Sequence, residues 1–360
     1  AWRELARVAE LAEAAVTTSW AARAAIDERD RHAVPMVYID AVNRARNEAD
    51  LVVVLGSRLG ETDWWGKAPY WARSDKQKLV QVDLDAETIG NNRPVDVAVQ
   101  ADVGRFLEAL GDALERVGGG ELSERRSWLA DLQAAGQRRR ARLDEALSNR
   151  NMPMHPAHVA TTCQRVLGED TVWIVDGGNT AIWANFYLQI RQPNTLLTTP
   201  KMGMLGAGVS QALAARIARP DSPVCCIIGD GAMGFHPQEV ETAVRHNLPV
   251  IWLVLCDKQW GMVKMTQQFA LKPIKTLVTR RLDASETINA DLGEIAFDEL
   301  ARSMGAHGER VADPAGLENA IARSLRSGRP AVIHVDVDPV AHLWAPNLKT
   351  FKDMHQEPAG

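Results

Sequence analysis

The chain has 360 residues, of which 46% are hydrophobic and 24% are charged, and its formal net charge at pH 7 is −5. This length fits two domains of ordinary size, and the mild acidity argues against nucleic acid or an anionic membrane surface as a partner. No apolar run approaches the roughly 20 residues that span a bilayer, and no secretory signal opens the sequence, so we expect a cytoplasmic protein. The cysteines lack metal-type spacing and are expected to be buried free thiols: Cys163, Cys225, Cys226 and Cys256.

The first half of the chain alternates helical and strand patterns. Helices are predicted at 3–15, 38–48 and 103–116, and strands at 51–55, 78–83 and 97–101. The first of these strands is entirely apolar, which predicts burial on both of its faces. The alternation predicts a parallel sheet covered by helices, that is, a doubly wound α/β domain over residues 1–118. Three glycines then break the pattern, and the charged stretch 119–152 is predicted to be a helical linker.

The second half repeats the α/β alternation more strongly, as a second doubly wound domain over residues 153–338. Strands are predicted at 171–176, 223–229, 249–256 and 330–336, and helices at 155–167, 206–218, 236–246, 296–304 and 314–327. Residues 339–360 are polar and are predicted to form a tail that lies over a surface. We expect its larger polar and aromatic side chains to be solvated: His342, Trp344, Lys349, Lys352 and His355.

Two aspartates follow consecutive predicted strands in the second domain. Asp230 stands in the sequence Gly229-Asp230-Gly231, and Asp257 ends the next strand. Ligands gather beyond the carboxyl ends of parallel strands, and two carboxylates brought together there repel each other unless a cation lies between them. Mg²⁺ prefers such oxygen ligands and commonly bridges to a phosphate, which the flanking glycines would allow to approach the backbone. A Gly-Asp-Gly turn without any ligand is the alternative.

The segment from Gly229 to Met262 resembles the signature of thiamine diphosphate (ThDP)-dependent enzymes, in which Gly-Asp-Gly is followed, after a helix, by a strand that ends in Asn-Asn. Residues 238–243 and 247–250 are similar to that helix and strand in the acetolactate synthase group. The resemblance implies that Mg²⁺ is bound by Asp230, Asp257 and the backbone carbonyl of Gln259. Because Asp257 stands where the family usually has an Asn, its additional negative charge beside a diphosphate is expected either to weaken cofactor affinity or to call for a compensating cation such as Lys258.

The same resemblance implies which residues surround the cofactor. Residues expected to bind ThDP are Gly178, Asn179, Thr180, Met204, Leu205, Gly229, Gly231, Ala232 and Met233. Leu205 would lie beneath the cofactor and hold it in a bent shape, while Trp260 and Met262 would wall the substrate pocket, so these three are the expected catalytic-site side chains. Ordinary apolar packing is the alternative for each of the three.

Residues 49–58, 80–85, 94–97 and 101–102 are similar to the central domain of the same enzymes, apparently without its first strand. Family members carry a further, pyrimidine-binding domain, whose glutamate activates the cofactor, and no Glu of this sequence can be assigned that role. The resemblance therefore implies a partner chain or domain that supplies the pyrimidine half, a homo-oligomer, and no activity of this chain alone. In related enzymes the central domain can hold a nucleotide, so FAD, ADP, CoA or no ligand is expected there. In relatives a C-terminal segment can also close over the active site, so a cation of the tail that contacts the substrate is the alternative to a solvated tail.

The implied reaction is that of an acetolactate synthase-like lyase, ligase or decarboxylase acting on a small 2-oxo acid or 2-hydroxyacyl substrate. Thr266 replaces a Trp of true acetolactate synthases, and the segment 60–62 lacks their substrate-binding Arg. The segments 178–180 and 234–235 are closer to 2-hydroxyacyl-CoA lyases and oxalyl-CoA decarboxylases. A non-catalytic regulatory protein on a degenerate ThDP scaffold is a second alternative. A dehydrogenase or other nucleotide-binding protein is disfavoured, since no G-x-G-x-x-G follows the first strand of either domain.

Overall fold

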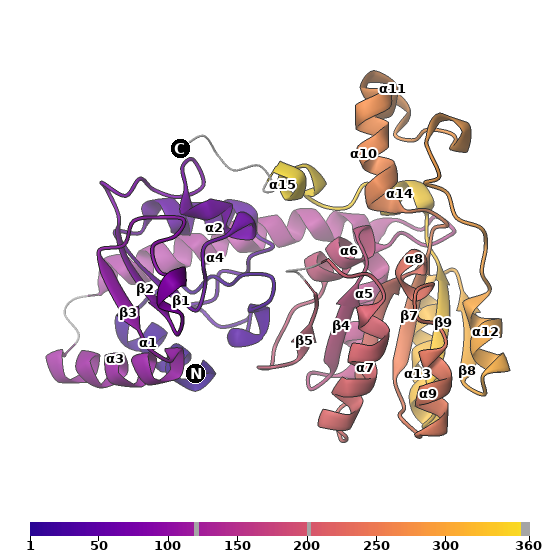
Figure 1. Ribbon diagram of the computed structural model, residues 1–360, viewed down its shortest axis with the longest axis horizontal. Helices are drawn as coiled ribbons and strands as arrows, with labels where there is room; N and C mark the ends of the chain where they lie inside the picture. The colour runs from indigo at the N-terminus through magenta and orange to yellow at the C-terminus, as the bar shows by residue number, and fades with distance from the viewer. Residues whose placement is uncertain (119–121, 200–202, 354–360) are drawn as a thin grey trace. The chain divides into compact units, whose positions relative to one another are not determined.

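The computed structural model describes residues 1–118, 122–199 and 203–353, which form two units (Figure 1). One unit comprises Ala1–Leu143 with the segment that begins at Lys349, and the other comprises Asp144–Leu348. Within the described residues, the first unit holds a three-stranded and the second a six-stranded sheet, both parallel. The predicted α/β class with two parallel sheets is confirmed. No helix in this part of the chain combines the length and apolar character needed to cross a membrane.

The elements of the first unit lie close to their predicted positions. Its strands are β1 (Leu51–Leu55), β2 (Lys78–Asp83) and β3 (Val97–Gln100), paired in that order. Its helices are α1 (Trp2–Ala12), α2 (Ile39–Glu48), α3 (Val103–Val117), α4 (Ser123–Asp144) and α15 (Leu348–Asp353). Helix α1 packs against α3, and α2 packs against α4 around the buried side chains of Val42 and Leu132.

Strand β1 is buried on one face, so the prediction that it is buried on both was wrong. Val54 is 6% exposed and packs in a cluster with Trp71, whereas Leu51 and Val53 are 52% and 36% exposed. Side chains of a strand alternate between its two faces, so a fully apolar run offers apolar groups to both. Within the described residues, packed side chains cover one of these faces.

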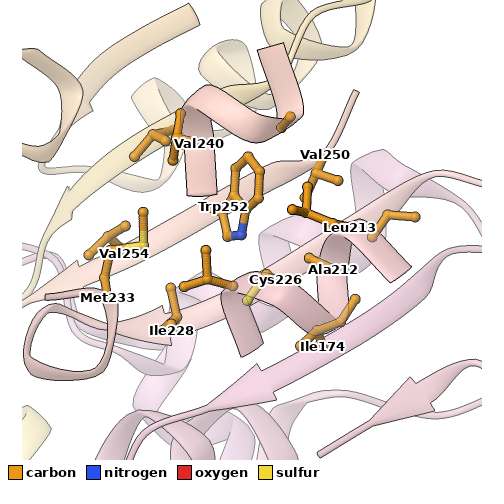
Figure 2. Packing of buried hydrophobic residues seen from close by; sticks show 14 of the residues in the cluster. Ile174, Ala212, Leu213, Cys226, Ile228, Met233, Val240, Val250, Trp252 and Val254 are labelled. Carbon is orange, nitrogen blue, oxygen red and sulfur yellow. The ribbon is translucent and has the colours of Figure 1, made fainter. Parts of the chain in front are cut away.

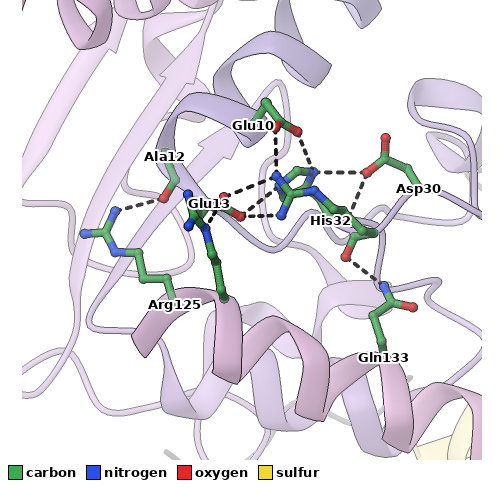
Figure 3. Close-up of polar contacts among 9 residues, drawn as sticks. Glu10, Ala12, Glu13, Asp30, His32, Arg125 and Gln133 are labelled. Carbon is green, nitrogen blue, oxygen red and sulfur yellow. Dashed lines mark hydrogen bonds and ion pairs between the residues drawn. The ribbon is translucent and has the colours of Figure 1, made fainter. Parts of the chain in front are cut away.

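A network of charged groups fixes the end of α1 to α4 (Figure 3). Glu13 follows α1 with a left-handed φ of 46°, and its carboxylate accepts hydrogen bonds from Arg31 Nη1 at 2.6 Å and Arg126 Nε at 2.8 Å. These two guanidinium groups lower the pKa of Glu13 to about 2. Arg125 of α4 donates to the backbone carbonyl of Ala12 at 2.9 Å. The carboxylate of Glu13 therefore links three segments of the first unit.

Replacing Glu13 with Gln should lower the denaturation midpoint at pH 7, because two guanidinium groups lose their shared carboxylate. The folded-state pKa of about 2 lies below the ordinary value of 4.5. The stabilisation is therefore full above about pH 4.5 and is lost as the pH falls towards 2. Urea titrations between pH 7 and pH 3 should show a constant difference between parent and variant down to about pH 4.5 and a shrinking one below it. Glu124→Gln, at an exposed position on α4, is the control, and a difference independent of pH would contradict the account.

The six strands of the second unit pair in the order β5-β4-β6-β7-β9-β8 and are all parallel. They are β4 (Val172–Asp176), β5 (Leu196–Leu197), β6 (Val224–Gly229), β7 (Ile251–Cys256), β8 (His307–Val311) and β9 (Ala331–Asp336). The four strands predicted for this domain are confirmed. The two edge strands were missed because β5 has two residues and β8 carries three polar side chains, as an edge position tolerates.

Helices pack along both faces of this sheet (Figure 1). Those of the second unit are α5 (Ala157–Leu167), α6 (Asn179–Tyr187), α7 (Ala207–Ala218), α8 (Asp230–Met233), α9 (Glu239–Arg245), α10 (Gly261–Leu271), α11 (Pro273–Thr279), α12 (Phe297–Ser303), α13 (Pro314–Ser327) and α14 (Pro339–Leu343). Side chains of α7, α9 and α12 cover one face, where Figure 2 shows the indole of Trp252 among Val240, Val250 and Cys226. On the opposite face the thiol of Cys163 on α5 contacts Cys225. All four cysteines are buried and free, as predicted.

The first residues of the predicted tail are part of the folded unit. Helix α14 packs against α6 and α10, and His342 and Leu343 are 4% and 1% exposed. The prediction of a solvated tail was therefore wrong for these residues. Trp344 is half-buried and donates its indole N–H to the carbonyl of Arg280 at 2.7 Å. The predictions for the side chains of Lys349 and Lys352, and for His355 as a whole, fall outside what the structure describes.

Candidate functional site

The register of the second sheet brings the two predicted aspartates together. Strands β6 and β7 are neighbours, with Gly229 opposite Leu255, so Asp230 and Asp257 follow their strands at the same edge. Asp230 Oδ2 accepts a hydrogen bond at 2.8 Å from the backbone N–H of Lys258, the residue after Asp257. Its Oδ1 accepts from the N–H of Gly231 at 2.7 Å. One carboxylate thus holds the loops that follow both strands.

Electrostatics at this edge disfavour two negative charges. Burial, followed by the charge of Asp257, raises the pKa of Asp230 to about 6. The hydrogen bonds from the Lys258 and Gly231 N–H groups oppose this rise without cancelling it. Asp257 is itself buried, with its side chain 1% exposed. A cation between the two carboxylates would remove the repulsion, and their oxygens are ligands that a divalent ion such as Mg²⁺ prefers.

Donors other than Lys258 satisfy Asp257. Its Oδ2 accepts hydrogen bonds from His342 Nδ1 at 2.6 Å and from Gln259 Nε2 at 2.8 Å. Lys258 has a left-handed φ of 57°, and its ammonium group pairs with Glu294 at 2.6 Å. The expectation that Lys258 compensates the charge of Asp257 was therefore wrong, because the lysine side chain is engaged by another carboxylate.

The loop after β4 faces the same edge, and its two polar side chains contact the C-terminal segment. Asn179 and Thr180 begin α6 and are 3% and 2% exposed. Thr180 Oγ1 lies 3.0 Å from Nε2 of His342, and Asn179 Nδ2 donates to the carbonyl of Leu343 at 3.2 Å. In the described residues Asn179 Oδ1 is buried without a hydrogen-bond partner. The site therefore holds one amide oxygen that remains available to a ligand.

Three glycines allow the loops of this edge to approach one another closely. A Cβ atom would come within 2.8 Å of Met262 if placed on Gly178, within 2.7 Å of Asn179 if placed on Gly261, and within 2.6 Å of the Trp260 ring if placed on Gly231. No side chain larger than hydrogen fits at these positions without displacement. Trp260 and Met262, predicted to wall a pocket, thus lie directly on the loops that carry the polar groups.

The remaining residues predicted to surround a cofactor are placed in two ways. The side chains of Ala232 and Met233 belong to the hydrophobic core, and Leu205 packs against the same core from its edge. Met204 is 54% exposed. Gly229 ends β6 opposite Leu255. Apart from the carboxylate of Asp230, the segment 229–233 therefore offers its backbone to a ligand, whereas Met204 offers an exposed side chain.

A cavity of about 340 Å³ opens beside Asp230. Trp260 and Phe235 line it with ring centroids 6.1 Å apart, and Lys258 and His334 also contribute to its wall. Its other lining residues are Gly231, Gly234, Cys256, Leu292, Gly293, Glu294, Ile295 and Phe297. Trp260 lies on the wall of this cavity, while Met262 lies beside Gly178 and is not among the lining residues; that either side chain contacts a substrate stays a prediction.

The sequence analysis missed His342 and the side chain of Gln259 as members of the site. The signal for His342 is local: Asp338-Pro339 is a helix-start pattern, and Asp338 accepts from the backbone N–H groups of Val340 and Ala341. Within that helix His342 lies beside the apolar Leu343. A histidine on a capped, apolar helix is expected to be buried and therefore hydrogen-bonded.

Comparison with known proteins identifies the family. Residues 176–335 match the family model "Thiamine pyrophosphate enzyme, C-terminal TPP binding domain", and residues 1–110 match "Thiamine pyrophosphate enzyme, central domain". The chain belongs to the thiamine pyrophosphate enzymes. The strand-end pair Asp230 and Asp257 lies within the TPP-binding match, whereas His342 lies beyond its last residue.

The curated relatives of this thiamine pyrophosphate enzyme chain include acetolactate synthases and an acetyltransferase. It is 30% identical over 328 residues to the acetolactate synthase large subunit IlvG of Mycobacterium tuberculosis, covering 88% of this chain and 55% of the relative. Identity is 28% over 308 residues with the acetolactate synthase isozyme 2 large subunit of Escherichia coli (84% and 50%). Identity is 27% over 317 residues with the sulfoacetaldehyde acetyltransferase of Alcaligenes xylosoxydans xylosoxydans, covering 80% of this chain and 50% of the relative. The chain spans about half the length of the curated relatives it matches.

Replacing Asp230 with Asn should stabilise the metal-free chain at pH 7, because the variant removes an ionised carboxylate that is partly desolvated and faces Asp257. The rise of its pKa from 3.8 to about 6 corresponds to about 3 kcal/mol. Solvent screening and the loss of one accepted N–H reduce the expected gain in the free energy of unfolding to about 1 kcal/mol. As the pH falls from about 6 towards 3.8, the folded-state carboxyl takes up its proton before the unfolded-state carboxyl does, so the gain should be smaller at pH 5 than at pH 7 and absent below about pH 3.8.

Urea denaturation in the presence of a chelator, at pH 7 and pH 5, measures this difference. Asp313→Asn is the control, since Asp313 caps α13 by accepting from the N–H of Gly316 at 2.8 Å and follows β8, which lies two strands away from β7 in the sheet. Asn also caps helices, so the control should change the stability by a few tenths of a kcal/mol at both pH values. An Asp230→Asn chain less stable than the parent at pH 7 would show that the carboxylate pair is not repulsive.

Proposed function

We propose that this chain carries the diphosphate- and magnesium-binding half of a thiamine diphosphate enzyme that makes or breaks a carbon–carbon bond next to a carbonyl. The observation that carries the proposal is the pairing of Asp230 and Asp257 at the carboxyl ends of β6 and β7, inside a TPP-binding domain. The raised pKa of Asp230 supports it, since this edge of the sheet favours a bound cation over two bare charges.

The residues present fit the cofactor. In this proposal Asp230, Asp257 and the backbone carbonyl of Gln259 bind Mg²⁺, and the segments 178–180 and 229–233 surround the diphosphate. The buried Asn179 Oδ1, which has no partner among the described residues, is an acceptor, so it suits a cation or a ligand donor and not the diphosphate oxygens, which themselves accept. Leu205 would support the cofactor from below, with Met204 beside it. When bound, thiamine diphosphate supplies a carbon nucleophile and stores the carbanion formed from the substrate.

The pyrimidine half of the site is proposed to come from a separate chain or domain outside these residues. The relatives are about twice as long as their matched region, and the family matches in this chain cover a central and a C-terminal domain. The partner would supply the glutamate that activates the cofactor, and without it we expect this chain to be inactive. A homo-oligomer is part of the same proposal.

The substrate is proposed to be a small 2-oxo acid or 2-hydroxyacyl compound, handled in the manner of an acetolactate synthase. The similarity to acetolactate synthases and to a sulfoacetaldehyde acetyltransferase supports this class. Trp260 and Phe235, on the cavity beside Asp230, would exclude water and contact the apolar part of the substrate, and Met262 would complete the wall from the side of Gly178. A 2-hydroxyacyl-CoA lyase or oxalyl-CoA decarboxylase reaction, with FAD, ADP or CoA in the central domain, is the variant of this proposal.

A second candidate is a non-catalytic regulatory protein on the same scaffold. It is favoured by Asp257, whose carboxylate places a second negative charge at the proposed metal site and already accepts hydrogen bonds from His342 and Gln259. In this alternative the donors stabilise Asp257 in a site that takes up no cofactor. The two candidates differ in a property that can be measured directly, which is uptake of ThDP with Mg²⁺.

Native mass spectrometry of the chain with ThDP and Mg²⁺ tests the proposal, because one spectrum reports both subunits and ligands. We expect adducts of the cofactor mass that need Mg²⁺, strengthened when a pyrimidine-domain partner is added. Asp230→Asn should lose the adduct, whereas Asp221→Asn, at an exposed position outside the site, should keep it. A parent chain without any adduct, even beside a partner, would leave the regulatory scaffold as the better account.

A further inference from the structure

We propose that His342 is a positioning residue of the cofactor site, which couples the metal ligand Asp257 to Thr180 on the loop expected to hold the diphosphate. This inference rests on the proposed function and adds the C-terminal helix α14 to the site. It also explains how a second carboxylate is accommodated beside Asp230.

The imidazole of His342 uses both of its nitrogens between two loops. Nδ1 lies 2.6 Å from Asp257 Oδ2, and Nε2 lies 3.0 Å from Thr180 Oγ1. A carboxylate accepts only, so Nδ1 donates to Asp257, while Nε2 forms the second bond with the threonine hydroxyl, which can donate or accept. The residue is 4% exposed, and water therefore does not compete for these bonds. His342 thus fixes the distance between the loop after β7 and the start of α6.

The backbone around His342 is held independently of its ring. Trp183 Nε1 of α6 donates to the carbonyl of His342 at 2.9 Å, and Asn179 Nδ2 donates to that of Leu343 at 3.2 Å. Asp338 caps the helix and accepts from the N–H of His342 at 2.8 Å through its backbone carbonyl. Because these bonds anchor α14, the imidazole of His342 is held in one orientation towards Asp257.

The two carboxylate oxygens of Asp257 therefore have different partners. Oδ2 receives two donors, His342 Nδ1 and Gln259 Nε2, and the latter also donates to the carbonyl of Pro339 on α14 at 2.8 Å. These donors stabilise the negative charge and fix the rotation of the carboxylate. Oδ1 is then the oxygen available to a cation shared with Asp230. Hydrogen-bond partners behind a metal ligand commonly change metal affinity by about 10–100-fold.

The affinity for Mg²⁺, measured by titration calorimetry of the full chain with saturating ThDP, tests the proposal. His342→Ala should weaken Mg²⁺ binding about 10–100-fold. His342→Asn keeps a donor close to the position of Nδ1 and should recover most of that loss. Trp183→Phe is the matched control, since it removes a hydrogen bond to the same helix but leaves the imidazole contacts. It should lower the melting temperature while changing Mg²⁺ affinity less than about threefold.

A purely structural role predicts a different pattern, in which Trp183→Phe and His342→Ala weaken Mg²⁺ binding in proportion to their loss of melting temperature. That result, or unchanged affinity in His342→Ala, would overturn the inference while leaving the proposed function intact. If His342→Ala does not fold, Thr180→Val takes its place, because it removes the hydroxyl that contacts His342. This variant should weaken Mg²⁺ binding severalfold, and an unchanged affinity would again overturn the inference. A parent chain that binds no ThDP with Mg²⁺ would overturn both proposals, because Asp257 would then have no cation to position.

Discussion

The site depends on the repulsion between two carboxylates that the sheet brings to one edge. Strands β6 and β7 are neighbours and run parallel, so the residues that follow them meet whatever their charge. Asp230 is held there by N–H groups from both loops, and its pKa is raised because burial and Asp257 disfavour its ionised form. The other features of the site either relieve this repulsion or fix the groups around it, including the donors to Asp257 and the close packing at Gly178, Gly231 and Gly261.

The second sheet can place such a site because apolar packing covers both faces of its central strands. The core around Trp252 fills one face, and residues such as Cys163 and Cys225 meet on the other, so both faces of β6 and β7 are covered. Polar groups are then gathered at the strand ends, where backbone N–H groups and loops remain accessible. The proposed thiamine diphosphate site uses this arrangement, and the hydrogen bonds of His342 connect it to helix α14.

Features set by local pattern were predictable from the sequence, and features set by distant contacts were not. The strand ends at Asp230 and Asp257 follow from apolar runs closed by polar residues, and the parallel sheet places them together. The exposed face of β1 was missed, because an apolar run does not say which of its faces is covered. The direction of the Lys258 side chain depends on the left-handed backbone conformation of this residue, which its neighbours in the sequence do not indicate. His342 was assigned to a solvated tail since its partner Asp257 is far away in the sequence.

The most direct test of the central claim replaces Mg²⁺ with Mn²⁺ and asks whether one ion touches both the carboxylate pair and the diphosphate. Pulsed electron–nuclear spectroscopy of the chain with Mn²⁺ and ThDP should show phosphorus couplings from the diphosphate on a protein-bound ion. The same spectrum of Asp230→Asn should show only ions in solution, either aqueous or on free ThDP, and no protein-bound ion. A parent chain in which Mn²⁺ stays aqueous, or binds without phosphorus coupling, would contradict the claim that Asp230 and Asp257 hold a cation for a diphosphate.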